Sequence, residues 1–219
     1  MLPPPLRVLY LHGFASGRQS RKASFFVEQL SRLNVPIEVP DLSEGDFEHL
    51  TITGQLKVVD RAIGGGPVAL IGSSLGGYLA ALCAAQHQQV TKVVLLAPAF
   101  RFYDLWREQL GEEGMRRWQG QGSLSVFHYA DGRERSIGYQ LMEDARQYGP
   151  FPDLQQPALI FHGNQDYTVP VSSSIEFART HPNVELVRVD SGHELTDILD
   201  AIWQKTRSFL FGSDLENRC

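Results

Sequence analysis

A serine flanked by glycines is the residue whose setting points most clearly to chemistry. The apolar run at residues 68–71 leads into Gly72-Ser73-Ser74-Leu75-Gly76, and an alanine- and leucine-rich helical pattern follows. Strand, tight turn and helix in this order predict a nucleophile elbow with Ser74 at its apex. The turn strains the serine backbone, so the residues two before and two after it must be small enough to approach each other. Alone, this pattern is equally compatible with an ordinary glycine-rich turn.

A serine hydroxyl needs a base within hydrogen-bond reach, and the base needs a third group to orient it. Asp166 follows the apolar run 158–161, and His193 follows the run 185–189. If these runs are strands of one parallel sheet, both side chains emerge with Ser74 at the edge where ligands bind in such folds. Singly, Asp166 could be a turn or cap residue, and His193 the start of the final helix. Together they predict a Ser74–His193–Asp166 catalytic triad.

Two backbone N–H groups are the expected stabilisers of an oxyanion formed at Ser74. Leu75 directly follows the serine, and Phe14 follows His12-Gly13 at the end of the first apolar run. Acyl transfer needs donors aimed at the developing negative charge, and these two loops supply them in such an arrangement. We therefore predict that the N–H groups of Phe14 and Leu75 form the oxyanion hole.

Other histidines and acids are less suitable as the base or its partner. His12 lies before the serine and is expected to shape its loop, while His162 is expected to be held inside the protein. Asp190 and Glu194 are too close to His193 in the sequence to align its ring easily. The remaining histidines do not follow a predicted strand: His49, His87, His128 and His181.

The elements that must position these residues alternate between apolar runs and helical patterns. Strands are predicted at residues 6–11, 37–39, 68–71, 93–97, 158–161 and 185–189. Helices are predicted after Ser20 as a cap, at about 47–63, 75–86 and 171–180, and from about Leu195 to the end of the closing amphipathic pattern. Such alternation predicts an α/β fold, with a mostly parallel sheet and helices on both faces.

The alternation stops between about residues 100 and 152. This segment is rich in charge and glycine, and residues 125–140 within it predict a hairpin that turns at Asp131-Gly132. We expect a lid-like insertion over the carboxyl edge of the sheet, within a single domain that spans residues 1–219. Its aromatic side chains form a small core of the insertion, or together line an apolar substrate pocket: Trp106, Trp118, Phe127, Tyr129, Tyr139 and Tyr148.

Composition restricts the classes of partner and compartment. The 219 residues are 42% hydrophobic and 21% charged, with a net charge of −5, which is typical of a soluble globular protein without a nucleic-acid partner. No apolar stretch approaches the roughly 18 residues of a membrane span, and residues 1–5 lack a signal-peptide pattern. Cys83 and Cys219 are the only cysteines, so we expect no disulfide framework, no metal or organic cofactor, and a cytoplasmic location.

Several motifs resemble the small bacterial YqiA-type esterases of the α/β-hydrolase superfamily. They are LYLHGFAS at 9–16 with Lys22-Ala23, GSSLGGY at 72–78 and APAFR at 97–101. The resemblance implies an α/β-hydrolase fold, activity on simple esters, and the roles of nucleophile, acid and base for Ser74, Asp166 and His193. The longer insertion departs from that family, and its Trp118-Gln119-Gly120 is reminiscent of mitochondrial acyl-protein thioesterases of the same superfamily.

The expected function is therefore a serine hydrolase that cleaves a small-molecule carboxylic ester or thioester through an acyl-enzyme. An acyltransferase or a peptidase could use the same triad. A hydrolase-like binding protein without catalysis is a further alternative. The residues do not choose between ester and thioester, and they do not indicate the length of the acyl chain or the oligomeric state.

Overall fold

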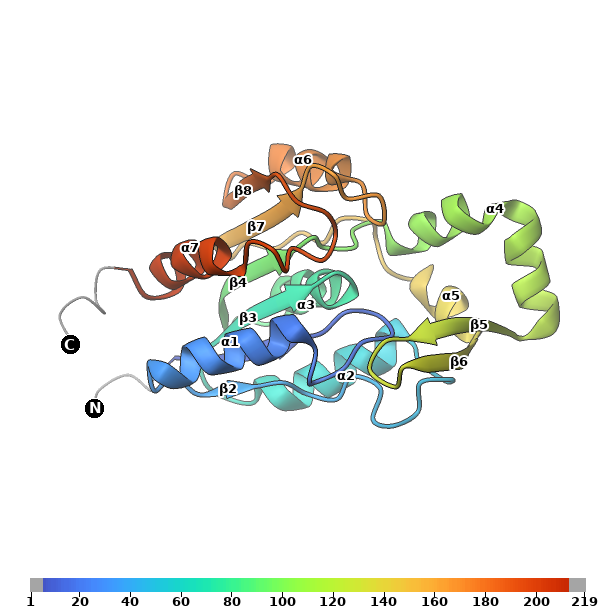
Figure 1. The fold of residues 1–219 in the computed structure, drawn as a ribbon, viewed down its shortest axis with the longest axis horizontal. Coiled ribbons are helices and arrows are strands. Elements are labelled where there is room, and N and C mark those ends of the chain that lie inside the picture. Colours follow the sequence, from blue (N-terminus) through green and yellow to red (C-terminus); the bar gives the residue numbers. More distant parts are fainter. Residues whose placement is uncertain (1–5, 213–219) are drawn as a thin grey trace.

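A six-stranded parallel sheet forms the centre of the protein (Figure 1). The computed structural model describes residues 6–212, so the expectations for residues 1–5 and Cys219 lie outside the described residues. The strands lie in the order β2-β1-β3-β4-β7-β8. Their bounds are β1 Arg7–Leu11, β2 Ile37–Glu38, β3 Val68–Ser73, β4 Val90–Leu96, β7 Ala158–Gly163 and β8 Val184–Val189. The predicted α/β-hydrolase sheet is thus present, with every strand placed close to its expected position.

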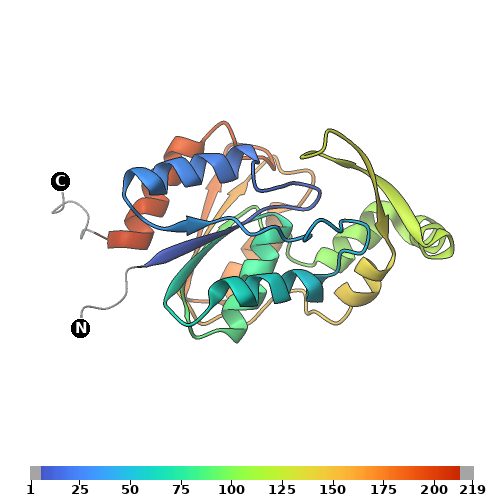
Figure 2. The same cartoon turned by 90° about the horizontal axis from the view of Figure 1, so that it is seen from below.

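Helices cover both faces of this sheet, as Figure 2 shows from below. Successive strand residues point to opposite faces, so Leu9 and Leu70 belong to one core cluster and Val8 and Ala69 to the other. The first cluster also holds side chains from α2, α3 and α6, and the second holds side chains from α1 and α7. The helix bounds are α1 Arg21–Arg32, α2 Ile52–Ile63, α3 Leu75–Gln86, α6 Val171–Thr180 and α7 Leu199–Phe211.

Two helices begin later than the apolar pattern predicts. Helix α2 begins at Ile52, because the Thr51 hydroxyl accepts a hydrogen bond from the Gly54 N–H at 2.9 Å and caps the helix there. Helix α7 begins at Leu199, and Leu195 instead has a left-handed backbone with φ 55°. In both cases, the apolar residues that precede the helix are buried, but they lie in a loop. The Ser20 cap of α1 is as predicted.

The segment between β4 and β7 forms two helices and a hairpin. They are α4 Phe102–Gln121, β5 Ser123–His128, β6 Arg133–Gly138 and α5 Gln140–Ala145. The antiparallel β5–β6 pair and its turn confirm the predicted hairpin. Helix α4 was not predicted, because Gly111 adopts φ 65° and kinks it. The kink divides the apolar side chains between two short faces, so no continuous helical stripe appears in the sequence.

This insertion has a small core and also reaches the loop after β1. Trp118 is fully buried, and its ring lies 5.3 Å from that of Trp106. Trp106 in turn lies 5.5 Å from the ring of Phe14. At the hairpin tip, the Tyr129 N–H donates a hydrogen bond to the Ala15 carbonyl at 2.7 Å. The insertion is therefore attached to the loop that carries the predicted oxyanion donor Phe14 and does not stand free of the sheet.

Replacement of Gly76 by alanine should destabilise the fold, because a Cβ atom there would overlap the carbonyl oxygens of Leu11 and His12. We expect a loss of about 2 kcal/mol or more in the free energy of unfolding, as for other overpacked sites, measured by urea denaturation. Gly120→Ala is the matched control, since Gly120 is also helical but has open space around it. It should be neutral or slightly stabilising, and equal stability of the two variants would contradict this description of the elbow.

Candidate active site

Ser74 occupies a strained turn between β3 and α3. Its backbone has φ 54° and ψ −120°, a left-handed conformation that side-chain-bearing residues avoid unless the surroundings hold it. Hydrogen bonds on both sides do so: the Ser74 N–H donates to the Leu96 carbonyl at 2.9 Å, and its carbonyl accepts from the N–H groups of Gly77 and Ala99. The predicted elbow is therefore present in geometry, with the serine at the carboxyl edge of the sheet.

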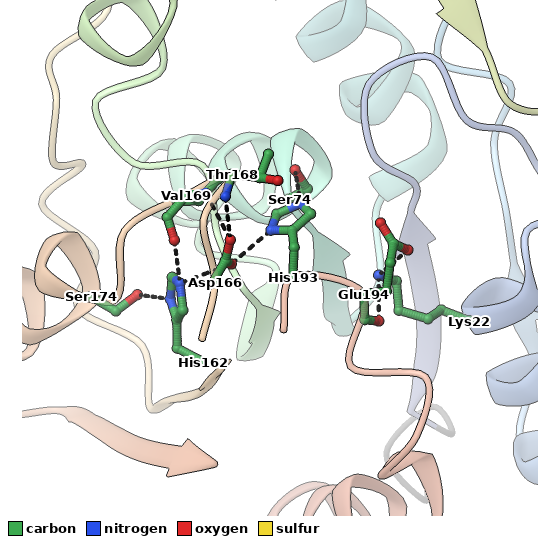
Figure 3. Close-up of polar contacts among 9 residues, drawn as sticks. All are labelled: Lys22, Ser74, His162, Asp166, Thr168, Val169, Ser174, His193 and Glu194. Atoms are coloured by element: carbon green, nitrogen blue, oxygen red, sulfur yellow. Dashed lines mark hydrogen bonds and ion pairs between the residues drawn. The ribbon is translucent and has the colours of Figure 1, made fainter. Parts of the chain in front are cut away.

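The structure brings the three predicted catalytic side chains together (Figure 3). The His193 Nε2 atom lies 3.1 Å from the Ser74 Oγ atom, and the His193 Nδ1 atom lies 2.7 Å from the Asp166 Oδ2 atom. The other carboxylate oxygen of Asp166 accepts the N–H groups of Thr168 at 2.9 Å and Val169 at 2.8 Å. Residues that follow β3, β7 and β8 thus form one continuous line of hydrogen bonds.

The Asp166 carboxylate is ionised despite its burial. Burial opposes the charged form, but hydrogen bonds from His162 and His193, the charge that His193 carries when it is protonated, and the Val169 N–H together hold the pKa of Asp166 well below its usual range. An ionised carboxylate only accepts hydrogen bonds, so the Nδ1 atom of His193 carries the proton in the neutral ring. Its Nε2 atom is then free to accept the proton of the Ser74 hydroxyl.

A second histidine contacts the same carboxylate. The His162 Nε2 atom lies 2.9 Å from the Val169 carbonyl oxygen and 3.2 Å from the Asp166 Oδ2 atom. Since both partners only accept, Nε2 must carry a proton, and in the neutral ring the Ser174 hydroxyl donates to Nδ1 at 2.7 Å. His162 is fully buried, as predicted. Its contact with Asp166 was missed, although its place at the end of β7, four residues before the acid, was a usable signal.

The two predicted oxyanion donors lie next to the nucleophile. Leu75 is the first residue of α3, so its N–H has no acceptor within the helix. The Phe14 N–H has no hydrogen-bond acceptor within residues 6–212. A Cβ atom on Gly13 would lie 3.4 Å from the Ser74 Cβ atom, so the loop that carries Phe14 runs alongside the serine. Their role as an oxyanion hole stays a prediction.

The rival residues have other partners. The His12 Nδ1 atom lies 3.1 Å from the carbonyl oxygen of Gly13, and burial lowers the pKa of His12. Asp190 accepts a hydrogen bond from Gln165, and Glu194 contacts Lys22. The remaining four histidines contact acids outside the site: His49 with Asp46, His87 with Asp60, His128 with Asp131 and His181 with Asp153.

Over residues 6–212, no group of three or more His, Cys, Asp and Glu side chains is arranged to hold a metal ion. In the same range, no helix combines the length and the apolar character that crossing a membrane requires.

Comparison with known proteins places this chain in a family. The family model of UPF0227, described as an uncharacterised protein family, matches residues 7–210. The chain belongs to this family. It is also 24% identical over 211 residues to the mitochondrial palmitoyl-protein thioesterase ABHD10 of Bos taurus. The matched region covers 88% of this chain and 68% of that protein. The resemblances to YqiA-type esterases and to acyl-protein thioesterases are confirmed.

Solved structures of other proteins have the same fold as this member of UPF0227. Alpha/beta hydrolase domain-containing protein 10 from mouse superposes with a TM-score of 0.81 at 20% identity, over 94% of this chain and 90% of that one. Est1E from Butyrivibrio proteoclasticus, with ferulic acid bound, superposes with a TM-score of 0.78 at 24% identity, over 95% of this chain and 88% of that one. A protein described as a putative hydrolase from Agrobacterium vitis superposes with a TM-score of 0.81 at 24% identity, over 93% of this chain and 87% of that one. The α/β-hydrolase fold is therefore shown.

The contact between His162 and Asp166 predicts a difference between two substitutions. A glutamine amide can occupy the place of the His162 Nε2 donor, whereas an asparagine amide reaches only the place of Nδ1. Because a hydrogen bond to a charged group contributes about 1.5–3 kcal/mol, we expect His162→Asn to lose about 2 kcal/mol of unfolding free energy at pH 7, and His162→Gln to lose less. Urea denaturation measures both.

The pH dependence of this difference has a defined sign. The lowered pKa of Asp166 stabilises the fold above the carboxyl pKa of the unfolded chain, near pH 4, and this stabilisation is lost as the pH falls through the folded value. The difference between wild type and His162→Asn should therefore be full above about pH 4 and shrink in more acidic solution. A difference that stays constant with pH would contradict the role assigned to His162.

Proposed function

We propose that this protein is a serine hydrolase that cleaves carboxylic esters or thioesters. The observation that carries the proposal is the unbroken line of hydrogen bonds from Ser74 through His193 to Asp166, at 3.1 and 2.7 Å. The names thioesterase and esterase among its relatives and structural neighbours support ester hydrolysis in general. In this proposal, Ser74 is the nucleophile, His193 the general base and acid, and Asp166 the group that orients the imidazole.

In the first half of the proposed reaction, the Ser74 Oγ atom attacks the acyl carbon. As the new C–O bond forms, the Oγ proton moves to the His193 Nε2 atom, and Asp166 stabilises the resulting imidazolium. The electron pair of the carbonyl bond moves onto the oxygen, where the N–H groups of Phe14 and Leu75 stabilise it. The oxyanion then collapses, the bond to the alcohol or thiol breaks, and His193 gives that leaving group its proton.

In the second half, water releases the acyl group from Ser74. His193 takes a proton from the water as its oxygen attacks the acyl carbon, and the same two N–H groups stabilise the second oxyanion. The bond to the Ser74 Oγ atom breaks, and His193 returns the proton to that atom. The products are a carboxylic acid and the free serine. The reaction as proposed needs no metal, no organic cofactor and no nucleic-acid partner.

Aromatic side chains around the loop beside Ser74 support an apolar acyl group as the substrate's acid part. The Phe14 ring lies 5.4 Å from that of Phe47 and 5.5 Å from that of Trp106, so the insertion contributes an aromatic side chain beside the loop next to the nucleophile. Among the relatives, one is named a palmitoyl-protein thioesterase, and one was solved with ferulic acid bound. We propose a single catalytic domain in which the insertion at about residues 100–152 forms part of the acyl-binding surface.

Replacement of Ser74 by alanine should abolish hydrolysis of a short p-nitrophenyl ester. Removal of a triad nucleophile is expected to lower kcat by at least about 10⁴-fold. Ser73→Ala is a matched control, because Ser73 is the adjacent buried serine and has no part in the proposed chemistry. Circular dichroism checks the fold of both variants. Activity that survives in Ser74→Ala, or an equal loss in Ser73→Ala, would refute the assignment.

A matched series of esters and thioesters tests the apolar acyl surface. If each added methylene is buried, it contributes up to about 0.8 kcal/mol, so kcat/KM should rise by up to about fourfold per carbon over short chains. Trp106→Ala should flatten this rise and leave the rate on an acetyl ester nearly unchanged. A wild-type rate that does not depend on chain length would contradict the acyl surface. The ratio of thioester to ester rates at equal length identifies the leaving group.

A further inference from the structure

Lys22 has an unusual position for a lysine. It lies in the first turn of α1, on the buried face that also carries Ala23, Phe26 and Leu30. Only 8% of its surface is exposed. Burying an ammonium group is costly unless hydrogen bonds and opposite charge compensate it, so the contacts of Lys22 indicate what it is there to hold.

The principal contact of Lys22 is with the backbone of Glu194. Its Nζ atom donates a hydrogen bond to the Glu194 carbonyl oxygen at 2.8 Å and lies 3.4 Å from the Oε2 atom of the same residue (Figure 3). The Glu194 side chain is 74% exposed, and such solvated ion pairs contribute little. The shorter bond to the carbonyl group is therefore the contact that fixes position.

Glu194 directly follows His193 in the segment between β8 and α7. Before the histidine, this segment is attached to the acid loop, because the Ser191 carbonyl accepts the Gln165 N–H at 3.0 Å. After the histidine, the carbonyl of Glu194 is held by Lys22 from a helix 172 residues earlier in the chain. His193 is thus suspended between two attachments, one on each side.

The charge of Lys22 is compatible with this role. Burial lowers the pKa of Lys22, while the negative charges of Glu194 and Asp166 raise it. Burial is the largest effect and the pKa of Lys22 is lowered overall, but the carboxylates of Glu194 and Asp166 oppose this shift and favour the charged, donating form. A charged donor forms a stronger bond to a carbonyl than a neutral one.

We propose that Lys22 is a positioning residue for His193, acting through the carbonyl group of Glu194. The bond fixes the backbone after the histidine, so that the imidazole stays between Asp166 and Ser74. Without it, this backbone can move away from α1 and carry the Nε2 atom out of reach of the Ser74 hydroxyl. This inference rests on the function proposed above, because the position of His193 matters only if it takes the proton of Ser74.

Lys22→Met tests the proposal, since methionine fills most of the same space without the donor. Displacement of a catalytic group by about 1 Å can cost about 100-fold in rate, so kcat on p-nitrophenyl acetate should fall by about 10- to 100-fold, with KM changed by less than about threefold. The proton between His193 and Asp166 gives a second readout. Its downfield NMR signal should weaken or broaden in the variant.

Lys92→Met is the matched control for lost stability. Lys92 also donates to backbone carbonyls, those of Phe209 and Leu210, each at 2.8 Å, but it lies near the start of β4, away from the carboxyl edge. It should lower the free energy of unfolding and leave kcat and the NMR signal as in wild type.

Two further variants keep the test decisive if Lys22→Met does not fold. Lys22→Gln ends one bond short of the ammonium position, so it should lose the carbonyl contact and lower kcat in the same way. Lys22→Arg retains a charged donor and should recover most of the rate.

The outcomes separate this inference from the proposed function. Normal kcat in Lys22→Met or Lys22→Gln, or an equal loss in Lys92→Met, would overturn the role of Lys22 while Ser74-dependent hydrolysis stands. Wild-type protein without any Ser74-dependent hydrolysis would overturn both.

Discussion

The close approach of three backbone segments at the elbow is the constraint on which the rest of the site depends. Gly76 leaves no room for a side chain beneath the carbonyl of Leu11, so α3 packs directly against the end of β1. The left-handed turn at Ser74 is possible only with this approach, and the Ala99 N–H bound to the Ser74 carbonyl attaches the loop after β4 to the same point. The loop of Phe14, the nucleophile and the start of the insertion therefore meet at one place because Gly72 and Gly76 have no side chains.

The second organising feature is a line of polar side chains at the carboxyl edge of the sheet, buried at Ser174, His162 and Asp166 and partly exposed at His193 and Ser74. It extends from Ser174 on α6 through His162, Asp166 and His193 to Ser74. Each hydrogen can be assigned from donors and acceptors alone, and the ionised carboxylate at its centre decides the tautomer of both rings. The Nε2 atom of His193 is therefore a free acceptor next to the Ser74 hydroxyl. Burial of polar groups usually lowers the stability of the fold, but here it leaves only one arrangement of hydrogen bonds for His162 and Asp166.

Local patterns predicted much of this, while contacts between distant segments were missed. Short motifs and strand periodicity predicted the elbow, the hairpin, and the order of Ser74, Asp166 and His193. The kinked helix α4 was not found, because Gly111 splits its apolar face. The bond from Lys22 to Glu194 joins segments 172 residues apart, and neither segment shows by its own composition that it has a partner. Long-range pairing of this kind becomes visible only when the sheet brings α1 and the histidine loop together.

In the proposed reaction, Ser74 is activated by His193 and Asp166 and forms a covalent intermediate. The most direct measurement is the reaction of the protein with a fluorophosphonate, followed by digestion and mass spectrometric mapping of the modified peptide. We expect one adduct, on Ser74, with loss of ester hydrolysis in proportion to its formation. An adduct on a different residue, or hydrolysis that continues in protein fully modified at Ser74, would contradict this mechanism.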